Sequence, residues 1–178
     1  MSYFMVDVEP DGPVPGTEDY SMIMIGVVLV RKPLEAAPRF LGRLRPISPR
    51  WDPKALDVIK ITREETMSFD DPRDVIRDFE SWVASNNRGK RAMFISDNNG
   101  FDYMFATWYL YHFLGRSPFG HTSTNLGSLY KGLVADTFKN FKHLRKTTHT
   151  HDPVDDAMGN AEALVTLQET TSLNILLE

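Results

Sequence analysis

The stretch FMVDVEP, residues 4–10, predicts a β-strand and decides the fold of the chain, because apolar residues occupy every second position. Successive side chains of a strand point to opposite faces, so these apolar residues share one face and Asp7 and Glu9 share the other. Neighbouring carboxylates repel each other and resist burial, so this second face either meets solvent or holds a cation. Hard cations such as Mg²⁺ and Mn²⁺ bind oxygen ligands and would relieve both costs.

Three further stretches predict the remaining strands of a sheet. Residues 22–30, MIMIGVVLV, form a nearly continuous apolar run that is typical of a central strand. The segment before this run is rich in turn residues, which predicts a loop. Residues 39–47 would add a third strand and complete an antiparallel meander, and residues 91–96 would add a fourth strand.

Helices are predicted between and after these strands. One begins at Pro72, which suits the first helical position, with Asp71 as its cap. A very apolar helix runs from about residue 100 to residue 114, and Gly115 ends it. The other predicted helices lie in residues 53–59, 126–133 and 152–170.

The order of these elements is three strands, a helix, a strand and then further helices. Such an order predicts an α/β fold in which helices flank a mixed sheet. The chain has 178 residues and shows no internal repeat or linker, so we expect a single domain over residues 1–178.

Composition argues against several classes of protein. Hydrophobic residues make up 42% and charged residues 25%, as in an ordinary globular protein. Apolar runs stay short of the ~20 residues of a membrane span, and the first of them does not resemble a signal peptide. The chain contains no cysteine, which removes disulfides and thiolate zinc sites and is consistent with a cytoplasmic location. The net charge of -4 argues against a basic nucleic-acid coat protein.

A third acid, Asp102, lies in the first turn of the apolar helix, in the string NNGFD. The helix dipole favours an acid at this position, which is one explanation for it. However, Asn98 or Asn99 can cap this helix, which leaves Asp102 free for another role. The helix also follows the carboxyl end of a strand, where open α/β sheets bind ligands.

The string HDPVDDA, residues 151–157, contains a further acid without an evident structural role. Asp152 is a good helix cap, and Asp155 three residues later completes an arrangement like a capping box. Asp156 has no such local role, and His151 precedes it by five residues. A histidine there can accept a proton at neutral pH, although a lone surface histidine is the simpler interpretation. His149 lacks an acid at the same spacing, so we expect His151 to be the functional histidine.

Together these three motifs resemble those of the DEDDh 3′–5′ exonucleases, a family with an RNase H-like fold. Asp7 and Glu9 match the family's Asp-x-Glu on the first strand, and Asp102 matches the acid of its second motif. His151 and Asp156 match its third motif, in which a histidine precedes an aspartate by five residues. The resemblance covers nearly the whole chain and implies a sheet made of an antiparallel three-stranded meander plus parallel strands.

The resemblance also implies a mechanism. Asp7, Glu9 and Asp156 would hold one Mg²⁺ or Mn²⁺ ion, and Asp102 would support a second. Two such ions stabilise the attacking and the leaving oxygen of an in-line displacement. His151 would accept the proton of the attacking water. The implied substrate is the 3′ end of single-stranded RNA or DNA, with RNA slightly preferred. The implied product is a nucleoside 5′-monophosphate. The resemblance also implies a homodimer.

The chain departs from the family pattern directly after the first motif. Many relatives carry small hydroxyl residues there, where the terminal nucleotide is held, but this chain has Pro10 and Asp11. An Asp-Thr pair that often follows the second motif corresponds either to Thr124–Asn125 or to Asp136–Thr137, and the sequence does not decide between them.

Basic stretches at residues 88–91 and 139–146 are candidates for contact with a phosphate backbone, although a solvated charged surface is the alternative. Phe141 in the second stretch either stacks on a base or packs in the core. We expect the substrate to contact Asn99, Phe101, Lys142 and Arg145.

Two other functions remain compatible with the same motifs. One is a catalytically weak RNase H-like module that binds nucleic acid, and the presence of all five motif residues argues against it. The other is an RNase H-like endonuclease, and the pair of His151 and Asp156 favours the exonuclease instead.

Overall fold

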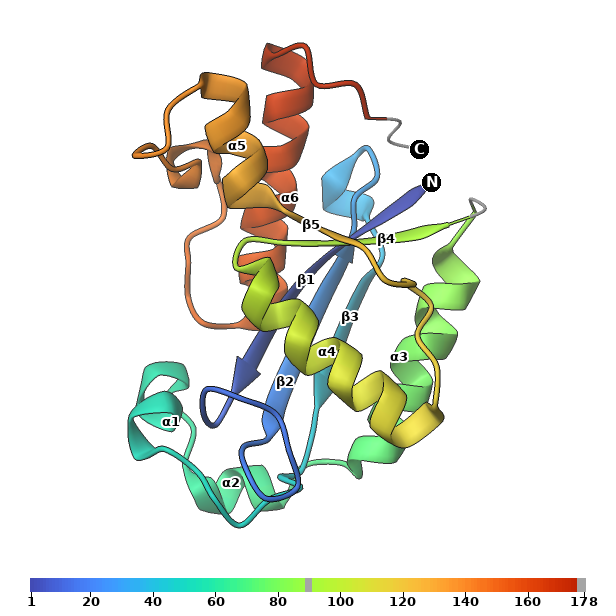
Figure 1. Ribbon diagram of the computed structural model, residues 1–178, viewed down its shortest axis with the longest axis vertical. Helices are drawn as coiled ribbons and strands as arrows, with labels where there is room; N and C mark the ends of the chain where they lie inside the picture. Colours follow the sequence, from blue (N-terminus) through green and yellow to red (C-terminus); the bar gives the residue numbers. More distant parts are fainter. Residues whose placement is uncertain (89–90, 176–178) are drawn as a thin grey trace.

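Five strands form one mixed sheet in the computed structural model, which describes residues 1–88 and 91–175. Across the sheet the strands follow the order β3-β2-β1-β4-β5. The first three pair antiparallel, whereas β4 and β5 run parallel to β1 (Figure 1). The strands are β1 (Ser2–Pro10), β2 (Met22–Leu29), β3 (Arg39–Arg43), β4 (Ala92–Ser96) and β5 (Ser123–Asn125).

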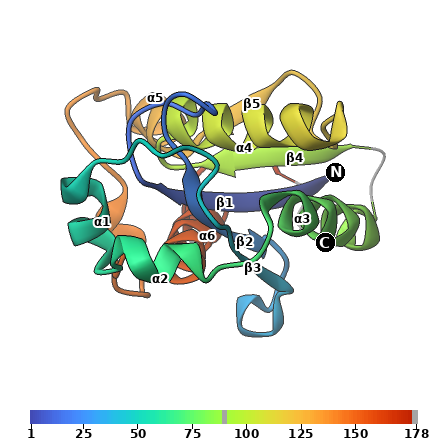
Figure 2. The same ribbon diagram turned by 90° about the horizontal axis from the view of Figure 1, so that it is seen from below.

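Helices cover both faces of this sheet. Helices α3 and α4 pack on one face and α5 and α6 on the other. Helices α1 and α2 lie next to each other at the end of the sheet away from the N-terminus (Figure 2). None of the helices in the described part of the chain combines the length and hydropathy of a membrane span. Their bounds are α1 (Pro53–Ile59), α2 (Arg63–Met67), α3 (Pro72–Asn86), α4 (Asn99–Leu114), α5 (Leu126–Val134) and α6 (Pro153–Thr170), with short 3₁₀ turns η1 (Leu34–Ala36) and η2 (Lys142–Leu144).

The alternation in β1 divides the core into two halves. Phe4 and Val6 pack with Phe79 of α3 and Phe105 of α4 on one side of the sheet. Met5 packs on the other side, in the cluster that contains the apolar residues of α6. All of these side chains are buried, so each stabilises the fold by roughly 1.5–3 kcal/mol relative to exposure. Asp7 and Glu9, which follow Met5 at two-residue intervals, therefore face α6.

Gly26 in the centre of β2 allows α6 to lie directly against the sheet. It is the cross-strand partner of Asp7. A Cβ atom at position 26 would lie 2.2 Å from the carbonyl carbon of Pro153 and 2.4 Å from the amide nitrogen of Val154. Such distances are shorter than any van der Waals contact, so only glycine permits this approach of the two backbones. The first turn of α6 is thereby held over the acidic face of β1.

The predicted fold is confirmed, with differences at particular elements. Asp71 caps α3 by accepting from the Arg73 N–H, and Gly115 ends α4 with a φ of 70°. The third strand ends at Arg43 rather than at residue 47, because the chain then pairs with Asp70 outside the sheet. Helix α2 and strand β5 were not predicted, since segments of five and three residues are too short for a hydrophobic period.

We predict that Gly26→Ala destabilises the protein by about 1–3 kcal/mol, because the added methyl group must push α6 away from β2. Thermal or denaturant unfolding measures the change. Gly132→Ala is the matched control, since a Cβ there meets nothing within 4 Å and alanine favours the helix α5. Equal stability of the Gly26→Ala variant and the wild type would contradict the close packing of α6 on β2.

Candidate active site

Three carboxylates from the two ends of the chain converge between the central strand β1 and helix α6. Asp7 and Glu9 lie on β1, and Asp156 lies in the first turn of α6. Each offers an oxygen, and these oxygens all lie within 4.8 Å of one another. Asp156 is buried and the two strand acids are half-buried, so solvent screens their repulsion only in part.

Asp102 joins this group through the open edge of β1. Strand β4 pairs with β1 only as far as Met5, after which its chain turns into α4. The next part of β1 therefore lacks a neighbouring strand on this side, and the Val8 N–H donates instead to Oδ1 of Asp102 at 3.3 Å. Asp102 is 4% exposed, and its charge acts on both Asp7 and Glu9. The fold thus brings the four acids of the predicted site to one place.

The two asparagines at the start of α4 have different roles. Asn98 occupies the cap position of this helix but makes no side-chain cap hydrogen bond. Asn99 donates from Nδ2 to Oγ of Ser123 at 2.8 Å. The expected cap is thus present at Asn98, whose carbonyl oxygen accepts from the N–H groups of Phe101 and Asp102, whereas the side chain of Asn99 ties the helix to β5.

Asp156 has more local contacts than the sequence indicates. Its carboxylate accepts from the backbone N–H groups of Thr150 and His151 at 3.2 and 3.1 Å. The expected cap at Asp152 is present, since its Oδ1 accepts from the N–H groups of Val154 and Asp155. The capping box is incomplete, because the Asp152 N–H donates to Oγ1 of Thr150 rather than to an acid of the first turn. Asp156 therefore fixes the loop before α6 as well as facing the other acids.

The electrostatics of the site penalise its charged form. Burial raises the pKa of Glu9 to about 8, and repulsion from Asp156 and Asp102 adds to the shift. Burial also raises the pKa of Asp102 to about 7. The pKa of Asp7 is raised well above its ordinary value by burial first and then by the charges of its acidic neighbours, and Arg145 opposes this shift. Without a cation, the group therefore holds protons near neutral pH.

The donor set fits a hard divalent cation. Carboxylate oxygens are the ligands that Mg²⁺ and Mn²⁺ prefer, and a cation replaces the protons that the acids otherwise retain. Asp7, Glu9 and Asp156 are the residues whose oxygens lie close enough together to share one ion. Asp102, which accepts from the Val8 N–H and whose charge acts on Asp7, adds a fourth carboxylate to this group.

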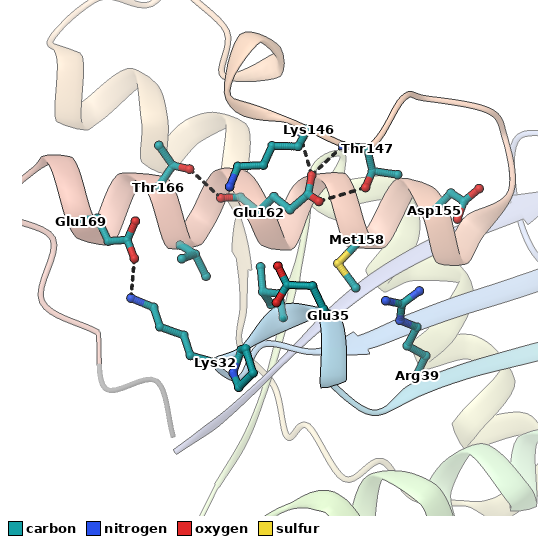
Figure 3. Close-up of a pocket in the computed structure, with 13 residues that line it drawn as sticks. Lys32, Glu35, Arg39, Lys146, Thr147, Asp155, Met158, Glu162, Thr166 and Glu169 are labelled. Carbon is teal, nitrogen blue, oxygen red and sulfur yellow. Dashed lines mark hydrogen bonds and ion pairs between the residues drawn. The ribbon is translucent and has the colours of Figure 1, made fainter.

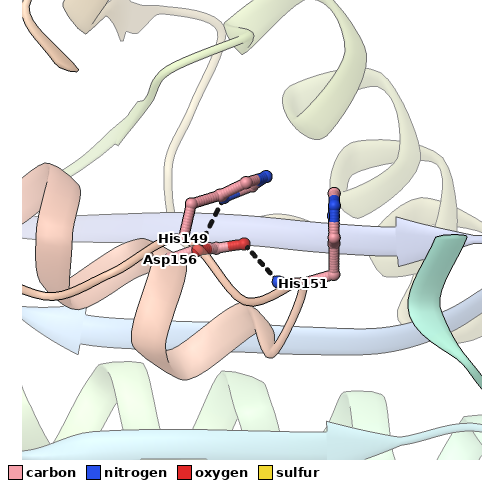
Figure 4. A group of neighbouring side chains, drawn as sticks. All are labelled: His149, His151 and Asp156. Atoms are coloured by element: carbon pink, nitrogen blue, oxygen red, sulfur yellow. Dashed lines mark hydrogen bonds and ion pairs between the residues drawn. The ribbon is translucent and has the colours of Figure 1, made fainter.

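Two histidines adjoin the acids, and the sequence favoured only one of them. Nδ1 of His151 lies 3.8 Å from Oε1 of Glu9. Nδ1 of His149 lies 2.7 Å from Oδ1 of Asp156, so His149 reaches the site although no acid follows it at the family's spacing (Figure 4). The two rings approach each other with centroids 4.3 Å apart. Spacing along the chain missed His149 because the loop turns back on itself at His151, whose φ is 62°.

Arg145 is a buried cation behind the site. Its guanidinium donates to Oδ1 of Asn160 at 2.5 Å and to Oδ2 of Asp97 at 3.4 Å, and its side chain is 8% exposed. The guanidinium also lies over the ring of Phe141. The contact of Arg145 with the substrate stays a prediction; the contacts observed in the structure hold the loop before α6 against the sheet. Phe141 is buried, which favours the core over stacking on a base.

Glu162 anchors the other side of the same loop. Its carboxylate accepts from the N–H groups of Lys146 and Thr147 at 2.7 Å each and from Oγ1 of Thr147 at 2.9 Å (Figure 3). These residues line a groove of about 650 Å³ between α6 and the loop that carries η1. None of the four clustered acids lines this groove. Arg145 and Glu162 together fix the start of the segment that carries His149 and His151.

Phe101, Lys142 and residues 88–91 are the other predicted contacts with the substrate. Phe101 is half-buried and packs on Phe105, with ring centroids 5.1 Å apart. Lys142 is exposed in η2, where its charge is free to meet a phosphate. The basic stretch at residues 88–91 lies partly outside the described residues, because positions 89 and 90 are not described. These contacts remain predictions.

Asp11, which departs from the family pattern, has a structural role. It is fully buried, and its oxygens accept from the Ser21 N–H at 2.5 Å and from Nη1 of Arg63 at 2.7 Å. Pro10 ends β1 at a shift in register with β2. Asp11 thus fastens the loop after β1 to Arg63, the first residue of α2.

The two candidate pairs after the second motif both make local contacts. Asn125 caps α5 by accepting from the Ser128 N–H, and Asp136 accepts from the Phe138 N–H. The choice between the pairs stays open.

A curated protein matches nearly the whole chain. The 3′–5′ DNA exonuclease Cap18 from Escherichia coli is 30% identical to this chain over 170 residues, which are 90% of this chain and 88% of that protein. No protein-family model matches the chain.

Solved structures share the fold. The nuclease domain of 3′hExo, a DEDDh family member bound to rAMP, has a TM-score of 0.75 and 17% identity, with 99% of this chain and 96% of that chain covered. Cell-death related nuclease 4 (CRN-4) has a TM-score of 0.75 and 14% identity, and the match covers 94% of this chain. This chain spans 64% of the length of CRN-4.

We predict that the protein without divalent cations loses stability as the pH rises from about 5 to about 8. The unfolded chain releases the protons of these carboxyls near their ordinary pKa, whereas the folded chain retains them up to the raised pKa of Glu9 and Asp102. Each such group lowers the free energy of unfolding by as much as about 1.4 kcal/mol per pH unit. Melting temperatures in EDTA across this pH range measure the effect, and added Mg²⁺ should restore more stability at high pH than at low pH.

Glu9→Gln should flatten this pH dependence because it removes one of the ionising groups. Glu64→Gln serves as the control, since Glu64 is exposed in α2. If both variants showed the pH dependence of the wild type, the raised pKa of Glu9 would not be the cause.

Proposed function

The chain belongs to the DEDDh family of 3′–5′ exonucleases, and on this premise we propose that its catalytic residues are Asp7, Glu9, Asp102, His151 and Asp156. The supporting observation is that residues from β1 and α6 bring three carboxylate oxygens within 4.8 Å of one another. Such a concentration of buried acids opposes folding unless it serves a cation.

We propose Mg²⁺ or Mn²⁺ as the cofactor, in two sites. Asp7, Glu9 and Asp156 would hold one ion, and Asp102 with Asp7 would hold the other. Divalent cations in such a site supply Lewis-acid stabilisation of the charge on the phosphate and a lower pKa for a bound water. The protein positions the four acids through the Gly26 contact, the Val8 N–H and the cap of α6.

His151 is the proposed general base. Its backbone N–H donates to Asp156, which places the residue at the edge of the acidic group. Its imidazole is 37% exposed, so it can reach a water molecule beside the substrate. Nδ1 of His149 instead points at Oδ1 of Asp156, so this nitrogen is already engaged in a contact with the carboxylate (Figure 4). We therefore assign the proton transfer to His151 rather than to His149.

The reaction is the hydrolysis of the last phosphodiester bond. Water adds to the phosphorus as His151 accepts its proton, and the bond from phosphorus to the 3′ oxygen of the preceding nucleotide breaks. That oxygen takes up a proton and becomes the new 3′ hydroxyl. The product is a nucleoside 5′-monophosphate.

We place single-stranded DNA first as the substrate. The supporting finding is the 30% identity to a 3′–5′ DNA exonuclease over nearly the whole chain. The sequence slightly favoured RNA, and discrimination between the two requires a contact to the 2′ hydroxyl. The preference for RNA therefore remains an alternative outcome of the substrate test.

We also propose that residues 1–178 act as one exonuclease domain, because the proposed site combines β1 near one end of the chain with α6 near the other. The homodimer and the cytoplasmic location stay predictions from the sequence.

We predict that His151→Asn lowers the exonuclease rate by about 100-fold or more while it leaves the binding of Mg²⁺ intact. Asparagine is a suitable replacement, because it tolerates the left-handed backbone at this position better than alanine. Rates on a labelled oligonucleotide and Mg²⁺-dependent melting shifts measure the two effects. His121→Asn in the exposed loop before β5 is the control and should retain activity. Parallel losses of rate and Mg²⁺ binding would argue against a role as base.

The substrate is tested by digestion of matched 5′-labelled ribo- and deoxyribo-oligomers and of a circular single-stranded DNA. We expect a ladder of products shortened from the 3′ end on the linear deoxyribo-oligomer and an intact circle, since an exonuclease requires an end. Faster digestion of the ribo-oligomer would make RNA the substrate, and cleavage of the circle would make the protein an endonuclease. Binding without cleavage in Mg²⁺ and in Mn²⁺ would indicate a binding module.

A further inference from the structure

The family motif accounts for His151 and Asp156 but not for His149. His149, His151 and Asp156 each offer one ligand atom, and these atoms lie within 4.8 Å of one another. We propose that these three residues form a second cation site, suited to Zn²⁺, whose occupancy inhibits the exonuclease. The inhibition rests on the proposed function, whereas the binding of Zn²⁺ does not.

The geometry of the three residues supports a local chelate. Nδ1 of His149 is already 2.7 Å from Oδ1 of Asp156, and the two imidazole rings lie with their centroids 4.3 Å apart. Figure 4 shows both rings on the same side of the Asp156 carboxylate. Zinc binds imidazole nitrogen at ~2.0–2.1 Å and carboxylate oxygen at ~2.0–2.2 Å, so modest rotations of the rings bring the ligands to one ion.

The burial of the residues also suits a chelate. Asp156 is 1% exposed and is held by two backbone N–H groups, so it is a fixed ligand. The side chains of His149 and His151 are 48% and 37% exposed, so they can rotate and an ion can reach them from solvent. All three lie within eight positions of the chain, from 149 to 156, so closing the chelate orders little backbone.

Arg145 places a positive charge next to the proposed cation site. Its Nη1 lies 3.5 Å from Nδ1 of His149, which repels a cation bound there. Arg145 is itself balanced by Asp97 and is hydrogen-bonded to Asn160. We therefore expect a regulatory affinity, weaker than that of a structural zinc site with four protein ligands.

Ligand type separates this site from the group of acids. Imidazole nitrogen favours Zn²⁺ over Mg²⁺ and Mn²⁺, whereas a set of carboxylates alone suits the harder ions. Asp156 belongs to both groups, so a Zn²⁺ ion on the two histidines competes with the ion that Asp7 and Glu9 share with it. Bound Zn²⁺ would also engage His151, the proposed base. Both effects stop the reaction.

The experiment uses the full chain in excess Mg²⁺. Zn²⁺ is titrated into the exonuclease assay and, separately, into the protein in a calorimeter, with His149→Gln as the test variant and His121→Gln as the matched control. His149→Gln should keep the activity measured without Zn²⁺. It should raise the Zn²⁺ concentration that halves the exonuclease rate by about tenfold to a hundredfold. Loss of a residue that only hydrogen-bonds to a metal ligand already lowers metal affinity by about this factor. His121→Gln should behave as the wild type.

The calorimetric readout keeps the two proposals apart. A Zn²⁺ site that is present in the wild type and lost in His149→Gln and in Asp156→Asn supports the chelate even if no exonuclease activity were found, in which case only the proposed function fails. Equal binding and equal inhibition in the wild type and His149→Gln would overturn the site. Zn²⁺ that supports catalysis rather than inhibiting it would overturn the inhibitory role. Melting curves establish that His149→Gln is folded.

Discussion

The approach of α6 to β2 at Gly26 is the contact on which the site depends. With no side chain at position 26, the backbone of Pro153 lies against the middle of the sheet, directly across from Asp7. This contact sets the distance between the first turn of α6 and the acids of β1. A residue of any other type would hold Asp156 away from them, although every element of the fold could still form.

The acids make the site unfavourable on its own, and the rest of the structure compensates. Burial raises the pKa of Glu9 and Asp102 toward or above neutrality, so the folded chain either keeps protons or requires cations. The aromatic and aliphatic clusters on both faces of the sheet supply the stability that tolerates this strain. A cation that binds these acids only in the folded chain would therefore raise the free energy of unfolding.

The loop before α6 is the adaptable part of the site. Arg145 and Glu162 fix its beginning, and the cap at Asp152 fixes its end. Between them the chain turns at His151 in a left-handed conformation, and this turn brings His149 beside the acid that His151 also contacts. One short segment thus brings two imidazole rings beside the carboxylate of Asp156.

The sequence by itself predicted four of the five strands and the long helices, because two-residue and helical periods, caps and glycine stops are local signals. Through the resemblance of its motifs to those of a family, it also predicted which acids belong together. Only the tertiary structure decided that Gly26 admits α6, that Asp102 bonds the open edge of β1 and that His149 reaches Asp156. These depend on distances between segments far apart in sequence or on a backbone turn, and neither property has a period or a composition that a single sequence reveals.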